Sequence, residues 1–129
     1  MNPGSANASS PVPQCVLLVE DNIIIALDTE EHLLSLGVVA VNLATSSGAA
    51  LASLKANPPG FALLDFNLGE ETSEPVAFAL EARGVRFAFA TGYGEVDRMI
   101  EKYPHSVGVL QKPYSKDDIA RIITQPVPA

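Results

Sequence analysis

Continuous apolar runs alternate along most of the chain with segments that carry helical spacing or helix caps. Runs of this length that lack polar alternation are typical of strands buried on both faces. They lie at residues 15–19, 38–44, 61–64, 85–90 and 107–111. A candidate helix follows each run, at residues 22–36, 46–56, 73–84, 95–103 and 115–124. The alternation predicts an α/β fold, in which helices cover both faces of a five-stranded parallel sheet.

The helix boundaries rest on capping signals. In the first helix, Ile24, Leu27 and Leu34 repeat at helical spacing, and Gly37 stands where a C-terminal cap belongs. Ser73, with Pro75 in the first turn, indicates the start of the third helix. Residues 115–118 (SKDD) have the form of a capping box and predict the start of the last helix.

Length and composition add a domain plan to this picture. The chain has 129 residues, of which 47% are hydrophobic and 18% charged, so it can bury one core and is too short for two. Residues 1–13 are free of charge and rich in Pro, Ser and Asn, and we interpret them as a flexible leader. The plan is therefore a leader over 1–13, one domain over 14–124 and a Pro-rich tail over 125–129.

The charge balance excludes several classes of function. Asp and Glu total 15 against 8 Lys and Arg, for a net charge of −7, which argues against nucleic acid or an anionic membrane as partner. A single cysteine, Cys15, and two distant histidines, His32 and His105, offer no zinc-site spacing. No signal peptide or membrane span is recognisable, so we expect a cytoplasmic protein.

Polar residues stand where the apolar runs end. Glu20 and Asp21 follow the first run, Asp65 ends the third, Thr91 follows the fourth, and Lys112 with Pro113 follows the fifth. In an open parallel sheet the functional crevice lies beyond the carboxyl ends of the strands. We therefore expect three carboxylates, one hydroxyl and one ammonium to meet at one edge.

This set of charged side chains is suited to binding a cation and a phosphoryl group. Carboxylates a few ångströms apart repel one another, and a divalent cation with all-oxygen ligands, Mg²⁺ above all, relieves that repulsion. The cation and Lys112 together can neutralise a phosphoryl group in transfer, and Thr91 can donate a hydrogen bond to it. Asp65, at the tip of the central strand, is the candidate nucleophile, because aspartate can carry a covalent phosphoryl group.

The chain resembles the receiver domain of bacterial two-component response regulators, the CheY-like family. The segments that carry the resemblance are LLVEDN (17–22), FALLDFNLG (61–69), FAFATGYG (87–94) and VLQKPYS (109–115), in receiver order within residues 14–124. The FATGYG stretch resembles more specifically the receiver subgroup called FAT GUY. The resemblance implies a flavodoxin-like, doubly wound (βα)5 fold with strand order 2-1-3-4-5.

The resemblance also implies roles for single residues. Asp65 matches the phosphoacceptor, Lys112 the phosphoryl-binding lysine that precedes a cis proline, and Thr91 the switch hydroxyl. Asp21 matches a direct Mg²⁺ ligand, and Glu20 a ligand that acts through water. Asn67 matches the position whose backbone carbonyl also binds the metal. The implied phosphodonor is a histidine kinase, of the HWE or a related type for the FAT GUY subgroup.

One position departs from the usual receiver pattern. Val109 stands three residues before Lys112, where most receivers carry an aromatic residue that turns inward on activation. The FAT GUY subgroup lacks that aromatic as well, so the departure agrees with the subgroup. We therefore assign the conformational response to Tyr93, whose glycine neighbours Gly92 and Gly94 make the loop deformable.

The sequence thus predicts a single-domain response regulator. It accepts a phosphoryl group on Asp65 with Mg²⁺ bound, is no enzyme except toward itself, and acts through an unknown downstream protein or as a phosphoryl relay or sink. Three alternatives stay open: a phospho-aspartyl hydrolase of the haloacid dehalogenase type, a flavodoxin-like mononucleotide carrier, and a pseudo-receiver that interacts without phosphorylation. A hydrolase of this type would have a second Asp at position 67, where this chain has Asn67. A mononucleotide carrier would have a glycine- or hydroxyl-rich loop after the first strand, where this chain has Glu20 and Asp21.

Overall fold

The computed structural model describes residues 10–92 and 101–128. Its main sheet holds five parallel strands: β1 (Cys15–Val19), β2 (Ala40–Ala44), β3 (Phe61–Asp65), β6 (Arg86–Thr91) and β7 (Ser106–Gln111). The strands lie in the order β2-β1-β3-β6-β7, which in chain order is 2-1-3-4-5. The predicted flavodoxin-like topology is confirmed.

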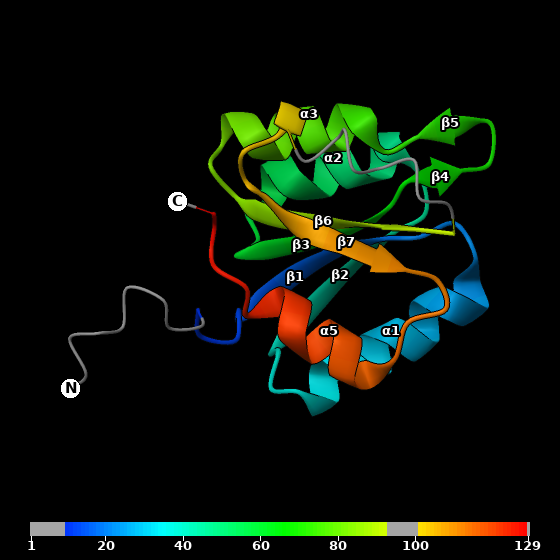
Figure 1. The fold of residues 1–129 in the computed structure, drawn as a ribbon. Helices are drawn as coiled ribbons and strands as arrows, with labels where there is room; N and C mark the ends of the chain where they lie inside the picture. The colour runs from blue at the N-terminus through cyan, green and yellow to red at the C-terminus, as the bar shows by residue number, and fades with distance from the viewer. Residues whose placement is uncertain (1–9, 93–100, 129) are drawn as a thin grey trace.

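Helices cover both faces of the sheet. The described helices are α1 (Ile23–Ser35), α2 (Ser47–Ala56), α3 (Glu74–Ala82) and α5 (Lys116–Ile123). In Figure 1, α2 and α3 lie on one face of the sheet, and α1 and α5 lie on the other. Most of the helix expected before Tyr103 falls outside the described residues.

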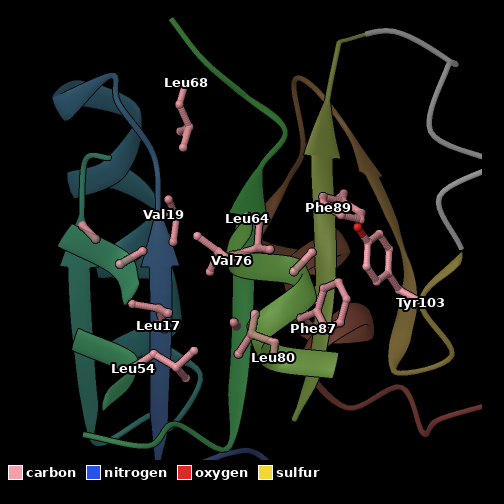
Figure 2. Close-up of a cluster of buried hydrophobic side chains, with 14 residues drawn as sticks. Leu17, Val19, Leu54, Leu64, Leu68, Val76, Leu80, Phe87, Phe89 and Tyr103 are labelled. Carbon is pink, nitrogen blue, oxygen red and sulfur yellow. The ribbon is translucent and has the colours of Figure 1, made fainter. Parts of the chain in front are cut away.

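Strand residues alternate between two cores because successive side chains of a strand point to opposite faces. Leu17, Leu64 and Phe89 belong to the core under α2 and α3. Figure 2 shows this core, with the rings of Phe87, Phe89 and Tyr103 grouped at one side. The intervening strand residues, such as Leu18 and Leu63, pack in the core under α1 and α5. Burial on both faces explains why these strands are continuously apolar in sequence.

Capping side chains begin three of the four described helices. Asn22 caps α1 by accepting hydrogen bonds from the N–H groups of Ile24 and Ile25, and Ser46 caps α2 in the same way. The capping box of α5, formed by Ser115 and Asp118, has both of its hydrogen bonds. Ser73 occupies the N-cap position of α3, but its hydroxyl makes no capping hydrogen bond.

The apolar residues whose spacing predicted the first helix do not form its buried face. Ile24, Leu27 and Leu34 have exposed fractions of 77%, 53% and 46%. The side chains of α1 that the sheet buries are those of Ala26, Thr29 and Leu33. The run 23–27 is apolar around most of the helix, so its hydrophobic pattern selects no single face.

The segment after the central strand, residues 66–72, contains regular structure. It forms a small antiparallel hairpin of β4 (Asn67–Leu68) and β5 (Glu71–Thr72). Gly69 has a φ of +75° in the turn, a conformation that side chains with a Cβ rarely adopt. The hydroxyl of Ser47 donates a hydrogen bond to the Thr72 carbonyl and so fastens the hairpin to α2.

Residues 10–13, the described part of the expected leader, contact the domain. The Ser10 N–H donates a hydrogen bond of 2.8 Å to the Thr124 carbonyl, and Pro13 is buried. Within residues 10–92 and 101–128, the helices are too short or too polar to cross a membrane.

Candidate functional site

Three carboxylates gather at the carboxyl edge of the sheet. Glu20 follows β1 directly, Asp21 comes next, and Asp65 ends the neighbouring strand β3. One carboxylate oxygen from each of these residues lies within 4.8 Å of the other two. Glu20 and Asp65 are buried and Asp21 is exposed, so the cluster opens to solvent on the Asp21 side.

Lys112 supplies the positive charge at this cluster. Its Nζ lies 3.0 Å from Glu20 Oε1 and 3.0 Å from Asp65 Oδ2. The Lys112 N–H donates to the Thr91 carbonyl at 2.8 Å, which extends the pairing of β6 with β7 and fixes where the side chain starts. Burial lowers the pKa of Lys112, but hydrogen bonds to the two carboxylates outweigh burial and hold the pKa above its usual value. The ammonium is therefore charged at neutral pH.

Glu20 is the most enclosed of the three acids. One of its carboxylate oxygens faces Lys112, and the other accepts a hydrogen bond of 3.1 Å from the N–H of Asn22. Burial and the nearby carboxyl of Asp65 raise the pKa of Glu20 above its usual value. Burial, more than the charge of Asp65, therefore disfavours the ionised form of Glu20.

The remaining predicted residues, Thr91 and Asn67, lie on β6 and on the β4–β5 hairpin. Thr91 is buried and is the last residue of β6, directly after Ala90, which pairs with Asp65. Asn67 is the exposed first residue of the β4–β5 hairpin, and the metal role of its carbonyl stays a prediction. A Cβ on Gly69, in the hairpin turn, would lie 3.9 Å from Asp21 Oδ2, so the hairpin borders the cluster.

Besides Thr91, the switch candidates are Val109 and Tyr93. Val109 lies in β7 opposite Phe89, half-buried against the core that includes Phe89 and Tyr103. The space near this position is thus occupied by rings from other elements. Tyr93, the other candidate, lies outside the described residues.

The sequence interpretation missed a contact next to Lys112. The hydroxyls of Thr29, in α1, and Tyr114, two residues after Lys112, lie 2.9 Å apart. Thr29 is buried inside α1 although it stands between Asp28 and Glu30 in the sequence, so no pattern of neighbouring residues marked it as a buried residue with a polar partner.

The donor set defines the chemistry that this edge can support. Carboxylate oxygens from three residues are the ligands that Mg²⁺ and similar hard cations prefer, and one side of the cluster is open for water or phosphate oxygens. Lys112 adds a fixed ammonium beside the Asp65 carboxylate. The residues present therefore fit a divalent cation and a phosphoryl group at the same place.

Comparisons with known proteins place this fold among signalling domains. The sequence matches no protein-family profile and no curated protein. Among solved structures, it is similar to SdrG from Sphingomonas melonis Fr1, with 37% identity and a TM-score of 0.72 over 85% of this chain and 92% of SdrG. It is also similar to the stress response regulator PhyR, with 26% identity and a TM-score of 0.75 over 95% of this chain and 47% of PhyR.

More distant structures share the fold at lower identity. The response regulator TrrA of Thermotoga maritima, solved with Mg²⁺ and BeF, is 17% identical with a TM-score of 0.72 over 82% of this chain and 92% of TrrA. Structures described as response regulator receiver domains have TM-scores of 0.71 to 0.74 at 18% to 24% identity. SdrG is 37% identical to this chain over 92% of its own length, and a likeness of this extent shows membership of the same family in addition to a shared fold. The chain belongs to the response regulator receiver domains, the CheY-like family.

Proposed function

We propose that this receiver accepts a phosphoryl group on Asp65 from a phosphohistidine of a histidine kinase. In this transfer the P–N bond of the phosphohistidine breaks and a P–O bond to Asp65 forms. Hydrolysis of the resulting acyl phosphate releases inorganic phosphate and restores the carboxylate. Both reactions take place on the protein's own Asp65, so in this proposal the protein catalyses no reaction of another substrate.

The observation that carries the proposal is the position of Lys112. Its ammonium lies 3.0 Å from Asp65 Oδ2, in a cluster with two further carboxylates. An ammonium at this place can hold the oxygens of a phosphoryl group bound to Asp65, where charge accumulates during transfer. Thr91, at the end of β6, is the hydroxyl assigned to the same oxygens.

Mg²⁺ is the cofactor that we assign to the acidic cluster. Asp21 would ligate it directly, Glu20 through water, and Asp65 and the Asn67 carbonyl would complete the protein ligands. When bound, the ion offsets the negative charge of the phosphoryl group and of the carboxylates. Without a cation, an incoming phosphoryl group meets three carboxylates and a single ammonium, Lys112.

We assign α1 as the surface that the kinase contacts. Ile23, Ile24 and Leu27 are exposed in the first turns of α1, directly after the site residues Glu20 and Asp21. Exposed apolar side chains that cluster on one face are typical of protein interaction sites. An HWE-type kinase and the FAT GUY subgroup are our finer assignments, and both rest on the FATGYG stretch over residues 89–94.

The direct test is phosphorylation by a small donor. Purified protein is incubated with Mg²⁺ and phosphoramidate, and the intact mass is measured by mass spectrometry. We expect a gain of one phosphoryl group that is absent in Asp65→Asn. Asp28→Asn is the matched control, because Asp28 is an exposed aspartate of α1 and should leave the gain unchanged.

Two outcomes would contradict the proposal. Retention of the mass gain in Asp65→Asn would place the acceptor elsewhere. No gain in a folded wild-type protein would instead favour the pseudo-receiver alternative, in which the domain interacts without phosphorylation.

A further inference from the structure

The segment that carries Lys112 crosses from the end of β7 to the start of α5. At its first end, the Lys112 N–H is bound to the Thr91 carbonyl. At its far end, Ser115 and Asp118 hold it through the capping box of α5. Between these attachments lie Pro113, which is exposed, and Tyr114, which is half-buried.

A hollow separates this segment from α1. It has a volume of about 540 Å³ and lies between one side of α1 and residues Lys112, Pro113 and Tyr114. Tyr114 packs partly against the apolar core under α1 and α5, but the hollow leaves the segment without close packing along one side of α1. The side chain of Lys112 therefore starts from a stretch of backbone with open space beside it.

One hydrogen bond spans this gap. The Tyr114 hydroxyl and Thr29 Oγ1 lie 2.9 Å apart, and Thr29 is buried within α1. In the part of the chain that the structure describes, this is the one hydrogen bond between α1 and residues 112–114. Burial raises the pKa of Tyr114, so the hydroxyl keeps its proton at neutral pH.

We infer that Tyr114 is a positioning residue for Lys112. Its hydrogen bond to Thr29 holds residues 112–114 against α1, in the position from which the Lys112 ammonium contacts both Glu20 and Asp65. The inference rests on the proposed function of Asp65 and adds a residue to it. The hydroxyl of Tyr114 is hydrogen-bonded to Thr29, and the residue acts through the backbone that leads to Lys112. Loss of the tether lets the segment shift into the hollow and takes the ammonium away from the acceptor.

The test compares three substitutions that each remove one hydrogen-bonded hydroxyl. Tyr114→Phe and Thr29→Val remove the two partners of the tether. Tyr103→Phe is the matched control, because it removes a tyrosine hydroxyl in the opposite core, under α2 and α3. The rate of phosphorylation by phosphoramidate is measured at saturating Mg²⁺, and the Mg²⁺ concentration for half the maximal rate is measured separately.

We expect both tether variants to slow phosphorylation by about two- to tenfold, the range that one hydrogen bond supplies. The half-saturating Mg²⁺ concentration should stay unchanged, since the carboxylates are untouched. The double variant should lose no more than either single variant, because each one already breaks the same bond. Tyr103→Phe should keep the wild-type rate.

A spectroscopic signature follows the ammonium itself. In ¹H–¹⁵N spectra of lysine side chains, the Lys112 NH₃⁺ signal is identified by its absence in Lys112→Arg. We expect slow hydrogen exchange for this signal in the wild type and in Tyr103→Phe, and faster exchange in Tyr114→Phe. A loss of stability elsewhere in the protein would not change the hydrogen-exchange rate of the Lys112 signal.

Unchanged phosphorylation rates and an unchanged Lys112 signal in Tyr114→Phe would overturn the inference. An equal loss of rate in Tyr103→Phe would also overturn it, because the effect would then be one of general stability. If the wild-type protein takes up no phosphate, the proposed function fails, while the ammonium signal still decides whether Tyr114 positions Lys112.

Discussion

The ammonium Nζ of Lys112 lies 3.0 Å from Oδ2 of Asp65. Lys112 follows β7 and Asp65 ends β3, and β6 lies between these two strands in the sheet. The lysine side chain reaches past the end of β6 to the central strand. The same ammonium also contacts Glu20, beyond β3. One cation thus serves two carboxylates from different strands.

Replacement of Lys112 should therefore affect the chemistry strongly. We expect Lys112→Met to slow phosphorylation by phosphoramidate about 100-fold, as the loss of one charge-stabilising donor typically does. Intact-mass time courses at saturating Mg²⁺ measure the rate. Lys116→Met is the control, since Lys116 is exposed in α5, and a similar loss there would contradict a specific role for Lys112.

Arg86 should stabilise the end of the chain. Its guanidinium donates hydrogen bonds to the carbonyls of Gln125 (2.6 Å) and Ile123 (3.1 Å), and it lies 5.1 Å from the centre of the Phe61 ring. We expect Arg86→Ala to lower the free energy of unfolding by about 2 kcal/mol, because two charge-assisted hydrogen bonds to the end of α5 are lost. Urea denaturation measures the change.

Two controls sharpen the Arg86 measurement. Arg83→Ala removes an exposed arginine near the same strand and should change stability by less than about 0.5 kcal/mol. Arg86→Lys should recover only part of the loss, because an ammonium cannot reproduce the planar fork of donors. Equal stability of Arg86→Ala and wild type would show that the contacts contribute nothing.

Tyr103 should make stability depend on pH in the alkaline range. Burial and its hydrogen bond to Glu74 raise the pKa of Tyr103 from 10.0 to about 12. The unfolded chain then loses this proton at lower pH than the folded chain does. The stability that the neutral hydroxyl provides is complete below pH 10.0 and is lost as pH rises to about 12.

Urea denaturation at a series of alkaline pH values checks this expectation. Tyr103→Phe should lower stability by about 1 kcal/mol at neutral pH, since it loses one hydrogen bond. The variant should also lose less stability than wild type between pH 10.0 and about 12. The same slope in both proteins would exclude Tyr103 as the titrating group.

The exposed apolar face of α1 should matter to a protein donor and not to a small one. Ile24→Ser should leave stability within about 0.5 kcal/mol, because the side chain is largely in solvent. Phosphoryl transfer from a histidine kinase should slow about tenfold, the cost of losing one anchor of an interface. Phosphoramidate should phosphorylate the variant at the wild-type rate.

The control for this surface is Phe78→Ser. Phe78 is an exposed apolar residue of α3, on the opposite face of the sheet. Kinase transfer to this variant should match wild type. If Phe78→Ser slowed the transfer and Ile24→Ser did not, the contact surface would have to be reassigned to α3.

The sheet and its functional edge could be predicted because both follow local rules. A parallel sheet brings the carboxyl ends of its strands to one edge, so the residues after each apolar run were sufficient to place Glu20, Asp65 and Lys112 together. Their separation in sequence did not obscure this. The distances within the cluster, in contrast, depend on side-chain conformations that no spacing encodes.

The burial of α1 could not be predicted in the same way. Its first turns are apolar on nearly every side, so spacing alone predicts the helix but does not say which of its faces is buried. The sheet instead selects Ala26 and Thr29, the first because it is small and the second because Tyr114 satisfies its hydroxyl. Contacts between distant segments decide such cases, as they also do for Arg86 and the end of α5.

The place of β7 in the sheet has a consequence for synthesis. Asp65 is synthesised before Lys112, and β7 must pair with β6 before the two side chains can meet. A chain that is interrupted or clipped between them keeps its three acids and has no counter-charge. Under the proposed function, a copy that ends before Lys112 would therefore lack the ammonium that phosphoryl transfer to Asp65 requires.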